Sequence, residues 1–180
     1  MIGDRRSQYA QGFYDQAWSD WQAYGVLTRA QNLPRCHPLH YLQMACEKLG
    51  KAYRLRNPRA NVDAIVTRHV GFTQFINEFL RSPAVMADYE GQRARHKAVS
   101  KTSSALAREI EKLAPAIDRT HSPENAEYPW EHGDWQNGTG QVLVPSTYDY
   151  PALSLLYTPG GRALMNLIER AFRDFNAGQL

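Results

Sequence analysis

The chain has 180 residues, of which 21 are Lys or Arg, 18 are Asp or Glu, and 43% are apolar. This size suits one domain with its own core, and the composition excludes a disordered chain. The sequence has no run of roughly 18 apolar residues, which excludes a membrane-spanning helix. Two cysteines are too few for a disulfide scaffold, so we expect a cytoplasmic protein. We also expect no membrane contact. A net charge of +3 permits a nucleic-acid partner without requiring one.

Helical periodicity dominates the first two thirds of the sequence. Aromatic and apolar residues recur every three to five positions after Arg5, which indicates one face of a long helix. Pro38 suits the first turn of a second helix that Asn57-Pro58 ends, and Ser82-Pro83 starts a further one. The patterns predict four helices, over residues 5–31, 38–56, 69–81 and 82–117.

Residues 119–158 have a different composition. Their prolines and their Asn-Gly and Gly-Gln pairs predict a long irregular loop, with a short strand or hairpin near Gln141–Val144. Because the segment is also rich in Trp and Tyr, we expect it to pack across the helices. Thr158-Pro159 then opens a last helix. The predicted fold is all-α: one domain over residues 1–180, built as an up-and-down bundle of about five helices.

The second predicted helix carries the string Gln43-Met44-Ala45-Cys46-Glu47-Lys48-Leu49-Gly50-Lys51-Ala52. This string is similar to the "hQ-A-EK-KA" string in the second helix of HEPN domains, and Glu127-Tyr128-Pro129 resembles a Tyr-Pro stretch that many of them show. The resemblance covers about residues 5–130. The same string also suits an ordinary packed helix, in which Glu47 and Lys51 form an i,i+4 ion pair.

The HEPN resemblance implies a module of a bacterial defence or toxin–antitoxin type system that binds RNA, a nucleotide or a protein partner, as a homodimer or docked on that partner. HEPN domains that cleave RNA resemble one another in an Arg-x4–6-His motif late in the bundle. The implied mechanism needs no metal, because the arginine holds the phosphate and the histidine moves protons.

This nuclease motif is displaced here. The spacing occurs as Arg35 and His40, before the second helix, while Arg119 and His121 stand in the expected place with one residue between them. These four residues are the candidate catalytic residues. We therefore expect a binding module without the family's nuclease motif, and a metal-independent endoribonuclease that uses a displaced Arg/His pair is the alternative.

Five basic residues share one arc of the fourth predicted helix, opposite its apolar arc: Arg93, Lys97, Lys101, Arg108 and Lys112. A line of cations can follow a phosphate backbone, so these are candidate nucleic-acid-binding residues, although a solvated helix face explains the same pattern. Arg95 falls near the apolar arc instead. There we expect it to meet a carboxylate, a cleft or a partner chain, because an unpaired buried guanidinium is costly.

Other kinds of site have weaker support. Cys36, His37 and His40 can ligate a metal, but no second pair with ligand spacing follows, and Gly138-x-Gly140 lacks the third glycine of a dinucleotide fingerprint. We therefore expect neither a metal nor a cofactor. The first helix carries more aromatic residues than one face of a bundle needs, so an exposed apolar strip that a partner chain covers is a further hypothesis.

Overall fold

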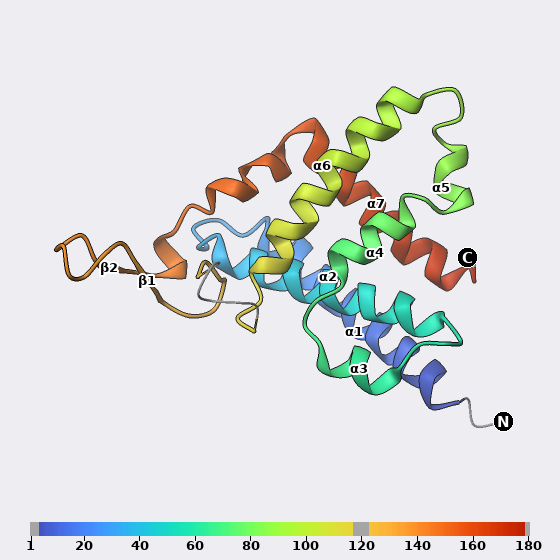
Figure 1. Cartoon of the computed structure of the whole chain (residues 1–180), viewed down its shortest axis with the longest axis horizontal. Helices are drawn as coiled ribbons and strands as arrows, with labels where there is room; N and C mark the ends of the chain where they lie inside the picture. Colours follow the sequence, from blue (N-terminus) through green and yellow to red (C-terminus); the bar gives the residue numbers. More distant parts are fainter. Residues whose placement is uncertain (1–3, 117–122, 179–180) are drawn as a thin grey trace.

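The computed structural model describes residues 4–116 and 123–178, and its helices confirm the predicted all-α bundle. Four helices are long: α1 (Arg5–Leu27), α2 (Cys36–Arg56), α6 (Arg93–Lys112) and α7 (Pro159–Asn176). Three are short: α3 (Val62–Thr67), α4 (Phe72–Phe79) and α5 (Pro83–Ala87). Figure 1 shows α1 alongside α2, and the closest neighbours of α6 are α4 and α7. No helix in the described ranges is long and apolar enough to cross a bilayer.

Helices α1 and α7 begin where they were expected. The Asp4 carboxylate accepts a hydrogen bond from the backbone N–H of Ser7 at 2.8 Å, which caps the first turn of α1. The Thr158 hydroxyl accepts from the N–H of Gly161 at the start of α7 in the same way, directly before Pro159. These two helices thus begin at a polar cap.

Helix α2 is the central element of the bundle. Twelve of its 21 residues are buried, against four of the 23 residues of α1. The small residues Ala45 and Ala52 are fully buried beside Leu49, and they let the neighbouring helices approach closely. The helix with the HEPN-like string therefore lies inside the molecule, as the amphipathic pattern predicts.

Two buried tyrosines tie α7 to α1 and to α2. The Tyr14 hydroxyl of α1 donates to the Phe172 carbonyl of α7 at 3.1 Å, and the Tyr53 hydroxyl of α2 donates to the Ala171 carbonyl at 2.7 Å. Each hydroxyl bonds a carbonyl of a neighbouring helix, so neither buried polar group is left unpaired. The aromatic rings pack in one core cluster that extends from α1 to α7.

Some predicted boundaries were wrong. The helix predicted over 82–117 is two helices, α5 and α6, because the chain turns between them at Gly91, whose φ is +71°. Helix α4 begins at Phe72 and not at residue 69, since Gly71 before it has a φ of +132°. The short α3, capped by the Asn61 side chain, was not predicted.

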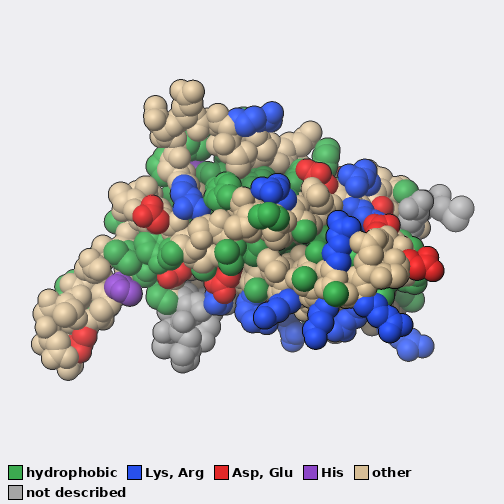
Figure 2. Space-filling model, turned by 90° about the horizontal axis from the view of Figure 1, so that it is seen from above, with side chains coloured by type: hydrophobic (Ala, Val, Ile, Leu, Met, Phe, Trp, Pro, Cys, Tyr) green, Lys and Arg blue, Asp and Glu red, His purple; other side chains and the backbone are tan. Residues whose placement is uncertain are grey.

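A hairpin exists, with its second strand at the place predicted for a short strand or hairpin, and it projects from the body. Strands β1 (Trp130–His132) and β2 (Gln141–Leu143) pair antiparallel, with Trp130 opposite Leu143. Figures 1 and 2 show this arm reaching away from the helices. The expected packing of the whole loop is therefore correct only in part: Trp130 is buried at the base of the arm, while Trp135 near its tip is 56% exposed.

Two 3-10 helices, η1 (Pro145–Thr147) and η2 (Pro151–Tyr157), lead from the arm back to α7. Tyr150 between them is 1% exposed, and its hydroxyl donates to the Asn125 carbonyl at 2.9 Å. Its ring stands edge-on to that of Tyr148, with centroids 5.0 Å apart. This part of the loop does pack on the bundle.

Candidate functional site

The cations of α6 form a row on the surface. Arg93, Lys97, Lys101 and Arg108 are exposed, and none of them has an ion-pair partner among the residues that the structure describes. Lys112 differs, because it is half-buried and pairs with Glu109 at 2.9 Å. Figure 2 shows Lys and Arg side chains gathered along one edge of the molecule. The four free cations, which we call the α6 row, extend over about 22 Å of helix.

The opposite side of α6 explains why the α6 row faces solvent. Leu106, Ala107 and Ile110 are buried, and they fix the rotation of the helix about its axis. Glu111 also points inward. Its carboxylate accepts from the backbone N–H groups of Gly71 and Phe72 and from the Thr73 hydroxyl, so it caps α4. This carboxylate therefore stabilises a helix start and leaves the charge of the α6 row uncompensated.

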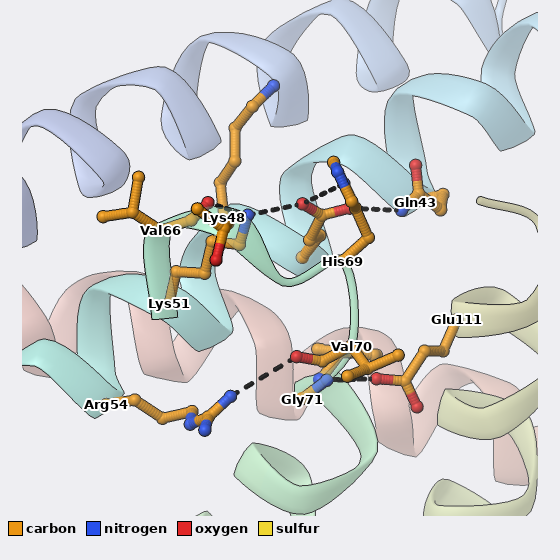
Figure 3. A network of polar contacts seen from close by, with 12 residues as sticks. Gln43, Lys48, Lys51, Arg54, Val66, His69, Val70, Gly71 and Glu111 are labelled. Atoms are coloured by element: carbon orange, nitrogen blue, oxygen red, sulfur yellow. Dashed lines mark hydrogen bonds and ion pairs between the residues drawn. The ribbon is translucent and has the colours of Figure 1, made fainter. Parts of the chain in front are cut away.

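The HEPN-like string of α2 holds a nearly buried polar network, which Figure 3 shows. The Glu47 carboxylate accepts from Gln43 Nε2 and from Lys51 Nζ, both at 2.9 Å, and lies 3.2 Å from His69 Nδ1. The Glu47 and Lys51 side chains are 11% and 6% exposed. Lys51 also donates to the Val66 carbonyl at 3.1 Å. The predicted i,i+4 pair is thus present, and it is far less exposed than a surface ion pair.

This network holds the connection between α3 and α4. Besides the contacts of Lys51 and Glu47, the Arg54 guanidinium donates to the Val70 carbonyl at 3.3 Å, and Glu111 holds Gly71 from the other side (Figure 3). Charged side chains of α2 and α6 therefore replace the water that would otherwise solvate this loop. Through these contacts the polar residues of α2 hold the loop before α4 in place.

A groove lies beside the network, at the C-terminal end of α6. It is lined by Gln43, Glu47 and His69 together with Ala114 and the segment 127–129. His40 stands one helical turn before Gln43 on α2, and its Nδ1 lies 3.3 Å from the Glu127 carboxylate. Two imidazoles thus each contact a carboxylate through Nδ1, and in the described part of the chain their Nε2 atoms make no hydrogen bond.

The Arg35 and His40 side chains point to different partners. The Arg35 guanidinium donates to the Asp149 carbonyl and stands over the Tyr157 ring at 5.6 Å. Five positions along a helix correspond to about 140° of rotation, which directs His40 toward Glu127 instead. The structure does not bring this candidate pair together. Arg119 and His121 lie outside the described residues.

Arg95 lines a surface hollow, and a cleft was one of the three surroundings expected for it. It is exposed, donates to the Gln92 side-chain oxygen at 2.9 Å, and stands 5.9 Å from the centre of the Tyr89 ring. It lines a shallow surface hollow together with Arg170. The first turn of α6 extends beyond the core because the chain turns at Gly91, so a residue on the apolar arc reaches solvent there.

Both cysteines are free thiols in the core. Cys36 and Cys46 are both buried, and burial raises the pKa of each thiol, which keeps it protonated and disfavours metal binding or nucleophilic attack. Over residues 4–116 and 123–178, no three His, Cys, Asp or Glu side chains gather as potential metal ligands. His37 beside Cys36 is exposed.

Sequence reasoning missed two residues that line the groove. These are His69, which contacts Glu47, and Glu127, which contacts His40. They lie 22 and 87 positions from the residues they contact, and no spacing rule links loop residues to a helix over such intervals. No family model, no curated protein and no solved structure matches this chain. The HEPN resemblance therefore rests on the residues quoted for it and stays a prediction.

Proposed function

We propose that this protein is an RNA-binding helical module, which uses the α6 row to follow a phosphate backbone. The observation that carries the proposal is the set of four exposed cations on one helix face without ion-pair partners among the described residues. Cations already engaged by carboxylates contribute little to phosphate binding, because the phosphate must displace the carboxylate. Counterion release makes such binding strongly dependent on salt.

The groove at the end of α6 complements the α6 row. It is lined by polar groups, among them the Glu47 and Glu127 carboxylates and the His69 imidazole, which can hydrogen-bond a base or a ribose, so in this proposal it receives one of these. Tyr128 lines the groove and is 51% exposed, so its ring offers a surface on which a base can stack. The bacterial defence or toxin–antitoxin setting of the module rests on the HEPN resemblance alone.

A binding titration tests the proposal. The probe is a fluorescent single-stranded RNA oligonucleotide, and the variant replaces all four cations of the α6 row with Gln. We expect the wild-type chain to bind and the variant to lose most of its affinity. The matched control is Arg59→Gln with Arg162→Gln, two exposed arginines outside α6, which should leave binding unchanged. Equal affinity in all three proteins contradicts the proposal.

A metal-independent endoribonuclease is the second candidate, and the two carboxylate-oriented histidines favour it. In this mechanism one imidazole removes the proton of a ribose 2′-hydroxyl, whose oxygen attacks the adjacent phosphorus. The other imidazole protonates the departing 5′ oxygen, which leaves a 2′,3′-cyclic phosphate. The carboxylates of Glu47 and Glu127 hold the rings by Nδ1, as an orienting carboxylate does in other histidine-dependent sites.

Incubation of the purified chain with RNA and a chelator tests this second candidate. Cleavage that survives chelation and disappears in His40→Ala and His69→Ala supports it. Loss in His121→Ala alone assigns the activity to the candidate outside the described residues. RNA that stays intact in the wild-type reaction removes the enzyme and leaves the binding module.

A further inference from the structure

The exposed face of α7 carries a symmetric pattern of polar residues. Asn166, Glu169, Arg173 and Asn176 are all exposed, and their intervals along the helix are three, four and three residues. Glu169 and Arg173 stand one turn apart, yet neither has an ion-pair partner among the described residues. This face therefore presents one free negative and one free positive charge at fixed positions on a rigid helix.

The pattern is complementary to itself. Glu169 and Arg173 lie two positions before and after Ala171, and Asn166 and Asn176 lie five positions before and after it. When two copies of α7 lie antiparallel about a two-fold axis at the level of Ala171, Glu169 faces the partner's Arg173 and Asn166 faces the partner's Asn176. A two-fold interface requires a surface that complements itself in this way.

An apolar anchor lies next to the polar strip. A groove between α1 and α7 is lined by Trp18, Trp21 and Phe172, and Glu169 and Arg173 line it as well. The Trp18 ring stands edge-on to Phe172 with centroids 5.2 Å apart, and 43% of the residue is exposed. Exposed tryptophans beside charged pairs are typical of the residues that dominate binding at interfaces.

We propose that a second copy of this chain docks on the α1–α7 face, with two reciprocal Glu169–Arg173 ion pairs and Trp18 buried beside them. The expected homodimer thereby gains a specific surface. The proposal uses a different face from the α6 row and does not depend on RNA binding. The partner is this chain itself, because the free charges on the face match each other in position and in sign.

Sedimentation velocity over a range of concentrations tests the proposal through charge reversal. We expect the wild-type chain to form a dimer. Glu169→Arg alone or Arg173→Glu alone creates two like-charge contacts across the two-fold axis, so each should raise the dissociation constant of the dimer at least about tenfold. The double variant E169R/R173E restores both pairs with exchanged signs, and it should dimerise again.

Two further variants complete the experiment. Trp18→Ala removes the anchor and should also weaken the dimer, whereas Arg59→Glu reverses an exposed charge elsewhere and should not. Circular dichroism verifies that each variant is folded, as expected for exposed positions. A monomeric wild-type chain, single reversals that leave the dimer intact, or a double variant no better than the singles each overturns the proposal.

Discussion

Helices α2 and α6 are of similar length and both carry Lys and Glu near each other, yet they use these charges in opposite ways. In α2 the Glu47–Lys51 pair is 11% and 6% exposed and holds the loop before α4. In α6 the Glu109–Lys112 pair is 29% and 38% exposed, and the α6 row beside it meets solvent. The difference lies in burial and not in composition.

This contrast separates structural charges from charges available to a ligand. A buried pair cannot turn toward a ligand without leaving its partner unpaired in the core, which is strongly unfavourable. An exposed cation without a partner is free to bind an anion at little cost to the fold. The HEPN-like string therefore belongs to the framework, while α6 is the surface on which we place RNA binding.

Removal of Lys51 should have the largest effect on stability. Lys51→Ala leaves the nearly buried Glu47 carboxylate without its cation and frees the Val66 carbonyl, so we expect a loss of about 3–5 kcal/mol in the free energy of unfolding. Urea denaturation measures this loss. Lys112→Ala is the control on α6 and should change stability by less than about 1 kcal/mol. Equal losses in the two variants would erase the contrast between the helices.

Glu111 tests the boundary between the two regions, since it is on α6 but points inward. Glu111→Ala leaves the backbone N–H groups of Gly71 and Phe72 without their acceptor, and we expect a loss of about 1–3 kcal/mol. Denaturation of Glu109→Ala, two positions earlier on α6 and with a side chain that is 29% exposed, provides the comparison. If Glu109→Ala proves as costly as Glu111→Ala, the inward role assigned to Glu111 is wrong.

The smallest effect on stability is predicted for the α6 row. Arg108→Gln should change the free energy of unfolding by less than about 0.5 kcal/mol, because the side chain is exposed and unpaired among the described residues. The same variant should weaken RNA binding. Lys112→Gln, by contrast, should leave RNA binding nearly unchanged, because that cation is already paired with Glu109. RNA titrations of the two variants under identical salt distinguish them.

The sequence was sufficient for elements whose signal is local. Periodicity predicted α1, periodicity together with a first-turn proline predicted α2 and α7, and the Asn-Gly and Gly-Gln pairs predicted a short strand or hairpin where β2 lies. It was insufficient where one backbone conformation decides the outcome. The left-handed φ of Gly91 separates α5 from α6, although the pattern around it suits a continuous helix. Nothing in the composition of residues 130–144 indicated that the hairpin would project instead of packing.

The candidate site shows the same division. The α6 row was predictable because five cations within one helix share an arc by spacing alone, and the structure then removed Lys112 from the free set. The surroundings of His40 and Glu47 were not predictable, because His69 and Glu127 reach them from loops distant in the sequence. A local pattern reveals what one helix presents, but not which loop residues come to meet it.

The salt dependence of RNA affinity tests the central claim most directly. We expect the logarithm of the association constant to fall linearly with the logarithm of salt concentration, and the slope to become shallower by about 0.7 for each cation of the α6 row replaced by Gln, or about 2.8 for all four. The Arg59→Gln and Arg162→Gln control should keep the wild-type slope. An unchanged slope in the four-fold variant, or no RNA binding by the wild-type chain at any salt concentration, would contradict the account.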